Sequence, residues 1–312
     1  MSILNQAFTH IQRQNVLMAH WRDTFRIARN PALFIARKRV AKRLKNTTNI
    51  QIQPSEGYAR GSLGDLPQID AMHPLLKSIA DERYNSIDRE MFNNGVAERT
   101  VKPFYFNLIG ERDLLTHSAF LDFSLSQEMI SIVSEYTGIL PELSHMAIFY
   151  SGEVPPNDKN RGTQVFHWDA HDFQHIKFFY FLDDVTEKDG PLMLLPADKS
   201  EWLRHKTGRR FRTLPFRDDA ELFRYFSKSD LVPLVGKEGS FAFVDTSRCL
   251  HCGSRTSKEG RRRTFVVHYT KFADYNQARS LPFQDFNMAV ARKCHSVAQK
   301  TPTSSLAYRL LN

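Results

Sequence analysis

Short runs of aromatic and β-branched residues alternate with polar, turn-forming stretches between residues 144 and 270. Runs of this length and composition are typical of β-strands, and the stretches rich in Gly, Pro and Asp between them are typical of turns. Seven such runs occur, at residues 145–151, 163–169, 176–185, 191–197, 231–236, 239–245 and 263–270. This spacing predicts an antiparallel β-sandwich or barrel in the second half of the chain.

The first part of the chain has a helical pattern instead. Residues 1–45 predict helices, with Pro31 at the first position of one of them, where a proline costs no hydrogen bond. In that helix the apolar residues share one face and the basic residues are expected on the other. The apolar set is Leu33, Ala36, Val40 and Leu44. The polar, glycine-rich residues 46–66 are expected to form a linker.

Three further stretches complete the pattern. Residues 124–138 predict a helix that has Ser124 as its N-cap and Gly138 as its C-terminal stop. Residues 102–109 have the composition of one more strand. Residues 201–230 interrupt the succession of strands, and we expect this insertion to be partly helical.

Composition and charge narrow the class of protein. The chain of 312 residues has a net charge of +9, and residues 22–45 alone carry nine basic residues and one acidic residue. The rest is nearly neutral, so no nucleic acid partner is expected. No apolar stretch long enough to cross a membrane is found, and the N-terminus does not have the pattern of a secretory signal. With three cysteines in the chain, we expect a cytoplasmic protein without a disulfide framework.

The basic segment at residues 22–45 has two interpretations. It can be a solvated face on a helix that packs on the domain through its apolar side. Alternatively, it makes weak contact with an anionic membrane or an acidic partner, which would place the protein at the periphery of a membrane.

The sequence FHWDAHDFQH at residues 166–175 contains a candidate metal site. On a helix, His171 and His175 would share one face, as in zinc metalloproteases, but the glutamate that those enzymes need is replaced here by Asp172. On a strand, His167 and Asp169 point to the same side. Two histidines and one carboxylate form the ligand set of many iron(II) oxygenases.

The distant second histidine is His251, which follows the apolar run 239–245. A zinc site at Cys249 and Cys252 is the weaker interpretation, because a structural zinc ion normally needs four ligands from paired sets and the remaining Cys294 lies alone beside His295.

Four elements in register resemble the phytanoyl-CoA dioxygenase-like family of iron(II)/2-oxoglutarate-dependent oxygenases. They are the H-x-D at 167–169, the stretch LDDVTEKDGPLMLLPADKS at 182–200, the HCGS at 251–254, and an arginine eleven residues after His251, Arg262. The resemblance covers about residues 145–270. The end of the second element departs from the family pattern, because PADKS stands where the family has P-G-S-H-K.

The resemblance implies a mainly β fold with α-helices, a double-stranded β-helix (jelly roll) flanked by N-terminal helices. It implies His167, Asp169 and His251 as ligands of Fe(II), and Arg262 as the partner of the far carboxylate of 2-oxoglutarate. Arg261 and Arg263 flank Arg262, and a shift of one residue would turn a different arginine inward. Lys177 and Phe179 share a strand face that lines the cosubstrate pocket in the family, although Lys177 can also be solvated.

The implied function is a dioxygenase that uses 2-oxoglutarate and O2 to hydroxylate an unidentified small organic or carrier-linked substrate, with succinate and CO2 as coproducts. The alternatives are a non-catalytic jelly-roll binding protein and a cupin-type metalloenzyme that does not use 2-oxoglutarate. We expect a basic helical N-terminal segment and linker over residues 1–66 and a jelly-roll oxygenase domain over residues 67–312, with the catalytic core at about 145–270.

Overall fold

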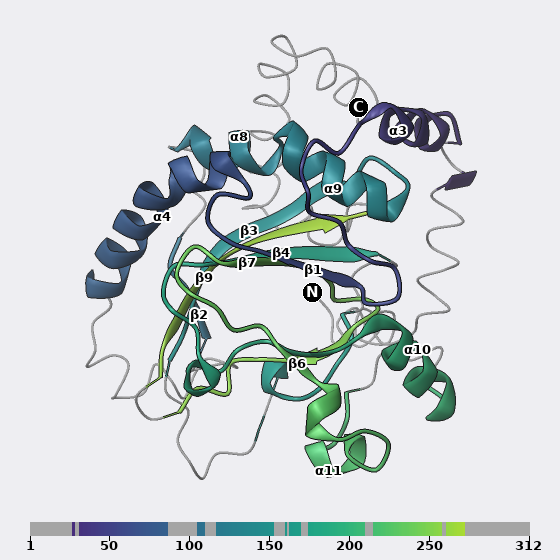
Figure 1. Ribbon diagram of the computed structural model, residues 1–312, viewed down its shortest axis with the longest axis vertical. Helices are drawn as coiled ribbons and strands as arrows, with labels where there is room; N and C mark the ends of the chain where they lie inside the picture. The colour runs from purple at the N-terminus through teal and green to yellow at the C-terminus, as the bar shows by residue number, and fades with distance from the viewer. Residues whose placement is uncertain are drawn as a thin grey trace, which may run out of the picture.

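Two antiparallel sheets form the centre of the protein in the computed structural model (Figure 1). The structure describes residues 27–28, 31–86, 105–109, 117–152, 160, 162–169, 174–209, 215–257 and 260–271. In order across the six-stranded sheet the strands are β1 (Tyr58–Gly61), β7 (Phe241–Asp245), β4 (His175–Phe181), β9 (Arg262–Thr270), β3 (Glu142–Ser151) and β2 (Tyr105–Asn107). The three-stranded sheet has the order β6 (Val232–Pro233), β5 (Met193–Leu195) and β8 (Leu250–Cys252). The prediction of an antiparallel β arrangement is confirmed.

The alternation along β4 defines two faces of the larger sheet. Ile176, Phe178 and Tyr180 are buried on the side of the helices, where Phe178 lies 5.6 Å from Phe123 between ring centres. The residues between them face the smaller sheet, and Phe179 packs there against an apolar cluster that lines the inter-sheet space. One strand thus supplies both the helix-facing core and the interior of the sandwich.

Helices cover the outer face of the larger sheet (Figure 1). They are α4 (Pro67–Ser86), α8 (Ser118–Ser124) and α9 (Gln127–Thr137). The predicted C-terminal stop at Gly138 is confirmed, since this residue has a φ of 69°, which glycine adopts without strain. The predicted N-cap is wrong. Ser126 caps α9 by accepting a hydrogen bond from the amide of Met129, because Ser124 already forms the end of α8.

Helix α3 (Pro31–Arg43) begins at Pro31, as predicted. Its basic residues are not all on the outer face, and that part of the prediction is wrong for Arg37, of which only 1% is exposed. Arg37 forms an ion pair with Glu142 at 2.9 Å and donates hydrogen bonds to the carbonyls of Leu140 and Lys271. These partners satisfy the buried charge and attach α3 to the start of β3 and the end of β9.

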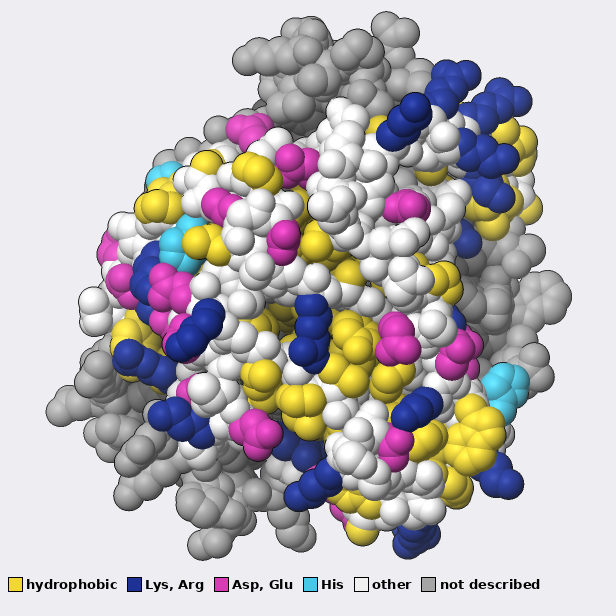
Figure 2. Space-filling view, in the orientation of Figure 1, with side chains coloured by type: hydrophobic (Ala, Val, Ile, Leu, Met, Phe, Trp, Pro, Cys, Tyr) yellow, Lys and Arg dark blue, Asp and Glu magenta, His cyan; other side chains and the backbone are white. Residues whose placement is uncertain are grey.

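The other basic residues described between positions 31 and 45 are exposed, and Figure 2 shows Lys and Arg side chains gathered over α3. They are Lys38, Arg39, Lys42, Arg43 and Lys45. On the opposite side of α3, the side chains of Val40 and Ala41 are buried. The side chain of Leu33 lies outside the described residues.

Two other stretches differ from the sequence prediction. Residues 58–61, expected in a linker, form β1 and pair with β7, so this part of residues 46–66 belongs to the larger sheet. Residues 163–169, expected as a strand, contribute the 3-10 helix η1 (Gly162–Gln164) and a single bridge between His167 and His251. The proposed division of the chain at residue 66 stays a prediction.

The predicted strands at residues 102–109 and within the other six runs are present, although several are shorter than the runs themselves. The insertion at residues 201–230 is partly helical, as predicted. The helices here are α10 (Ala197–Lys206), α11 (Asp219–Leu222) and the 3-10 helix η3 (Lys228–Asp230). Outside the insertion, a further 3-10 helix, η2 (Glu187–Asp189), precedes β5. Among the described helices, none is both long enough and apolar enough to cross a membrane.

Candidate metal centre

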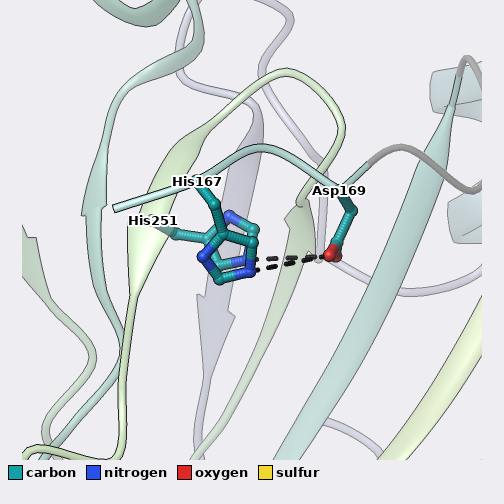
Figure 3. A group of neighbouring side chains, drawn as sticks. All are labelled: His167, Asp169 and His251. Carbon is teal, nitrogen blue, oxygen red and sulfur yellow. Dashed lines mark ion pairs between the residues drawn. The ribbon is translucent and has the colours of Figure 1, made fainter. Parts of the chain in front are cut away.

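His167, Asp169 and His251 converge on one point at the inner side of the smaller sheet (Figure 3). One ligand atom from each of the three residues lies within 4.8 Å of the other two. Nε2 of His167 is 3.8 Å from Oδ1 of Asp169, and Nε2 of His251 is 3.8 Å from Oδ2. In the part of the chain that the structure describes, this is the only group of three His, Cys, Asp or Glu residues with such spacing.

Backbone pairing places these three side chains. His167 and His251 exchange hydrogen bonds between their amides and carbonyls, at 2.9 and 3.0 Å, so their rings lie 4.4 Å apart between centres. The amide of Asp169 donates to the carbonyl of Thr246 at 2.9 Å. Trp168, between the two ligands in sequence, is buried in an apolar cluster on the opposite side. The predicted alternation of His167 and Asp169 is therefore present in a segment that is only bridged to β8.

The hydrogen bond made by Nδ1 of each histidine determines which tautomer the ring adopts, and so what its Nε2 presents to the site. Nδ1 of His167 lies 2.8 Å from the carbonyl of Val165, and Nδ1 of His251 lies 2.9 Å from the carbonyl of Cys249. A carbonyl can only accept, so Nδ1 carries the proton in both rings, and each Nε2 presents a lone pair towards Asp169. Hydrogen bonds of this kind orient the histidine ligands of metal ions.

The charges of the site also suit a cation. Burial would raise the pKa of Asp169, but the positive charge of Lys177, 2.7 Å away, is the largest opposing effect, and the pKa lies well below its usual value. Burial, with a smaller effect from His167, lowers the pKa of His251 to about 3. The carboxylate is thus ionised and the imidazole of His251 neutral at physiological pH, which are the forms that bind metal ions.

His175 and Lys177, on β4, lie beside this group. Nδ1 of His175 is 3.6 Å from Oδ2 of Asp169, while Nζ of Lys177 is 2.7 Å from the same oxygen. His175 belongs to a strand, so the helical pair of the zinc protease arrangement does not describe it, and His171 lies outside the described residues. Of the two interpretations left open for Lys177, the structure shows the inward one, and its contact is with a candidate ligand. Its role towards a cosubstrate stays a prediction, as does that of Phe179.

Arg262 is the first residue of β9 and lies on its inner face. Its Nη2 atom is 3.4 Å from the hydroxyls of both Ser151 and Ser254, and a Cβ atom at Gly253 would lie 3.7 Å from it. Because Gly253 is two residues after His251, the guanidinium lies in the neighbourhood of the candidate metal ligands. A role in binding 2-oxoglutarate stays a prediction.

The two neighbours of Arg262 are directed elsewhere. Arg263 points to the helix side, where it forms ion pairs with Asp183 and Asp81. Arg261 is exposed, and its amide donates to Asp189. Of the three arginines, Arg262 therefore faces the interior in this register, and it is the one eleven residues after His251.

The two cysteines that the structure describes are not among the candidate ligands. Cys249 and Cys252 are buried, and burial raises the pKa of both thiols, that of Cys252 to about 12. A thiol that stays protonated is a poor metal ligand. Cys249 instead donates to the carbonyl of Glu56, as a small strand-end residue would.

The sequence analysis missed the polar residues around the site. Ser151 and Ser254 come together beside Arg262 from positions 103 residues apart, with 3.0 Å between their hydroxyl oxygens. Ser254 belongs to the HCGS element, which was a usable signal. Ser151 ends a strand without any motif, and only the register of β3 against β9 brings it to Arg262.

No protein-family model and no curated protein matches this chain. Similar solved structures include EctD from S. alaskensis with 2-oxoglutarate and 5-hydroxyectoine, at 14% identity and a TM-score of 0.46, covering 69% of this chain and 72% of EctD. Another is the epimerase SnoN in complex with Fe3+, alpha ketoglutarate and nogalamycin RO, at 16% identity and a TM-score of 0.43, covering 77% of this chain and 84% of SnoN. HygX from Streptomyces hygroscopicus, with nickel and 2-oxoglutarate bound, is 15% identical with a TM-score of 0.42, covering 71% of this chain and 86% of HygX.

Proposed function

We propose that this protein is an iron(II)/2-oxoglutarate-dependent oxygenase that hydroxylates a small organic or carrier-linked substrate, with succinate and CO2 as coproducts. The observation that carries the proposal is the convergence of His167, Asp169 and His251 within 4.8 Å. Two imidazoles and one carboxylate leave open positions on a six-coordinate ion, as non-haem iron oxygenases require. Bound iron would supply the oxygen chemistry, and the protein supplies the ligands, the orientation and the enclosed space.

The path of the chain supports a double-stranded β-helix. After β3 in the larger sheet, the chain bridges to β8 at His167, returns as β4, crosses to β5 and β6, returns as β7, crosses to β8 and returns as β9. From β3 onward the chain thus crosses repeatedly between the two sheets, with β5 and β6 consecutive in the smaller one, as expected for the jelly roll of these oxygenases. Membership of the phytanoyl-CoA dioxygenase-like family is part of the same proposal.

The surroundings of the ligands support a dicarboxylate cosubstrate. Arg262 faces the interior beside two serine hydroxyls, and an arginine fork binds a carboxylate with good geometry. Phe179 belongs to the apolar lining of the same inter-sheet space. In this proposal, the near end of 2-oxoglutarate binds the metal, and Arg262, Ser151 and Ser254 hold the far carboxylate.

The decisive experiment is an anaerobic titration of the purified protein with Fe(II) and then with 2-oxoglutarate, followed by a screen of candidate substrates for succinate release in air. We expect one equivalent of iron to bind, 2-oxoglutarate to bind only to the iron-loaded protein, and succinate to form. The His251→Ala variant is the matched control and should show none of the three.

Two outcomes would contradict the proposal in different ways. Iron binding without binding of 2-oxoglutarate would favour a metalloenzyme that uses another chemistry. Failure of the wild-type protein to bind any divalent ion would favour a non-catalytic binding protein.

A further inference from the structure

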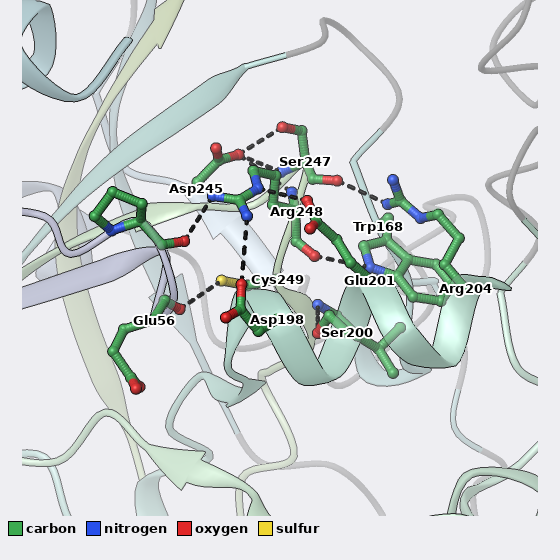
Figure 4. Close-up of polar contacts among 12 residues, drawn as sticks. Glu56, Trp168, Asp198, Ser200, Glu201, Arg204, Asp245, Ser247, Arg248 and Cys249 are labelled. Atoms are coloured by element: carbon green, nitrogen blue, oxygen red, sulfur yellow. Dashed lines mark hydrogen bonds and ion pairs between the residues drawn. The ribbon is translucent and has the colours of Figure 1, made fainter. Parts of the chain in front are cut away.

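Trp168 lies between two candidate ligands in sequence, and its side chain is buried in an apolar cluster. Figure 4 shows the indole beside the side chain of Arg204. Only 2% of Trp168 is exposed. Its indole Nε1–H donates to the carbonyl of Arg248 at 3.1 Å. The guanidinium of Arg204, from α10, lies 4.5 Å from the ring centre, and Phe216 packs 6.0 Å away. The indole is therefore held by a hydrogen bond at its edge and a cation over its face.

The turn that receives this hydrogen bond presents three successive carbonyls to the same region. Thr246 accepts from the amide of Asp169 at 2.9 Å, and Ser247 accepts from Nη2 of Arg204 at 2.7 Å. Arg248 accepts from Trp168. The turn thus holds the backbone of one candidate ligand, the side chain before that ligand, and the cation that covers this side chain.

The turn is itself fixed from behind. The buried carboxylate of Asp245 accepts from the amides of Ser247 and Arg248, from the Ser247 hydroxyl, and from the Tyr136 hydroxyl of α9. The side chain of Arg248 binds Glu201 at 2.7 Å, and it donates to the carbonyl of Pro54 and the hydroxyl of Tyr136. With both faces of the turn anchored, its three carbonyls are fixed acceptors.

The segment that carries His167 and Asp169 needs such an anchor. It is joined to the smaller sheet by one bridge, whereas β4 and β9 share a ladder of seven residue pairs. Side chains that point to opposite sides of an extended segment rotate together when the backbone turns. We propose that Trp168, held by Arg204 and by the turn at residues 245–248, is a positioning residue that fixes the orientation of His167 and Asp169 for metal binding.

This inference rests on the proposed metal centre, and its test measures the metal directly. Co(II) is titrated anaerobically into the wild-type protein and the variants, and the visible absorption of the bound ion is recorded. Trp168→Phe keeps an aromatic ring but removes the hydrogen bond to Arg248. Arg204→Met keeps the length of the side chain but removes the cation, and Arg204→Lys restores it. Trp202→Phe is the matched control, because Trp202 is also on α10 but is 51% exposed.

We expect Trp168→Phe and Arg204→Met to bind Co(II) 10- to 100-fold more weakly, about the loss typical when a group that orients a metal ligand is removed. The absorption of the Co(II) that remains bound should change in shape, because the ligand geometry is altered. Arg204→Lys should recover part of the affinity, and Trp202→Phe should match the wild-type protein.

A change in thermal stability alone, with unchanged Co(II) affinity and absorption in Trp168→Phe and Arg204→Met, would overturn the inference and leave the metal centre intact. If Trp168→Phe does not fold, the two Arg204 variants decide in the same way. Failure of the wild-type protein to bind Co(II) would refute the metal centre and this inference together.

Discussion

The two sheets differ in how they are built and in what they hold. The larger sheet has long ladders, with nine residue pairs between β3 and β9, and its outer face is covered by helices through a continuous apolar core. The smaller sheet has strands of two or three residues, and its position depends on turns and single hydrogen bonds. Of the three candidate ligands, His251 belongs to β8 of this smaller sheet, and His167 is joined to it by a single bridge. The comparison suggests a division between a sheet that supplies stability and a sheet that supplies chemistry.

The sharpest test of this division is to remove a ligand of the candidate metal centre. His167→Ala, Asp169→Ala and His251→Ala should each lose divalent metal binding by more than about 100-fold, because losing a ligand costs more than losing a group that orients one. The unfolding midpoint of the metal-free protein should change little. Isothermal titration with Co(II) and thermal unfolding measure the two quantities.

His175→Ala is the control for these variants, since His175 is close to Asp169 but outside the group of three. It should retain the metal, and the same is predicted for His171→Ala. Retention of the metal by His167→Ala, together with its loss in His175→Ala, would contradict the ligand assignment.

The converse change is made in the larger sheet. Phe178 is fully buried between β4 and the helices, so Phe178→Ala should lower the free energy of unfolding by about 3–5 kcal/mol. Chemical denaturation measures this loss. The native fraction of the variant should still bind Co(II) with the affinity of the wild-type protein. A drop in metal affinity as large as that of His251→Ala would break the division between the sheets.

A single strand allows the same comparison between its two faces. Arg262 faces the smaller sheet. The Arg262→Ala variant leaves the far carboxylate of 2-oxoglutarate without its partner, so it should bind 2-oxoglutarate more weakly by about 2–5 kcal/mol, or roughly 30-fold to several thousand-fold. Arg263 faces the helices, where it binds Asp183 and Asp81. Arg263→Ala should therefore lower the melting temperature and leave 2-oxoglutarate binding intact. Titration of 2-oxoglutarate into the metal-loaded variants checks both, and an exchange of the two results would show that the inward arginine is wrongly assigned.

The smallest effect is expected on α3, which is attached to the larger sheet by Arg37. We predict weak cosedimentation with anionic vesicles at low salt, since a cation near an anionic surface contributes about 1 kcal/mol. Replacing Lys38, Arg39, Lys42, Arg43 and Lys45 by Gln should reduce it, and so should high salt. Arg37 is kept in these variants, because it is buried in an ion pair. Binding that persists in the Gln variant would show that α3 is a structural helix only, as the scaffold role of the larger sheet implies.

The same difference explains what could be predicted from the sequence. The core strands β3, β4, β7 and β9 were found because each is a run of five residues or more, rich in aromatic and β-branched residues and bounded by turn-forming stretches. The candidate ligands were found because they belong to spaced motifs. Strand β1 was missed since four residues, two of them Gly and Arg, carry no alternation, and their pairing partner is in β7.

Single residues were missed for a related reason. The cap moved from Ser124 to Ser126 because a preceding helix, which the pattern did not reveal, occupies the first serine. The burial of Arg37 depends on two carbonyls more than 100 and more than 230 residues away. The anchor of Trp168 likewise depends on a turn 80 residues away. Contacts of this range follow from the assembled fold, and local propensity contains no information about them.

The order of strands in the larger sheet has a consequence for how the protein is made. β1 pairs with β7, and β3 pairs with β9. Strands from the first half of the chain can therefore pair only after strands near the end of the described chain have been synthesised. Such non-local pairing gives a high contact order and slow folding. During synthesis from the N-terminus, both edges of β4 stay unpaired until β7 and β9 have left the ribosome, and unpaired strand edges of this kind are where newly made chains associate wrongly. The chain would therefore depend on chaperones most in the interval before residue 270 is complete.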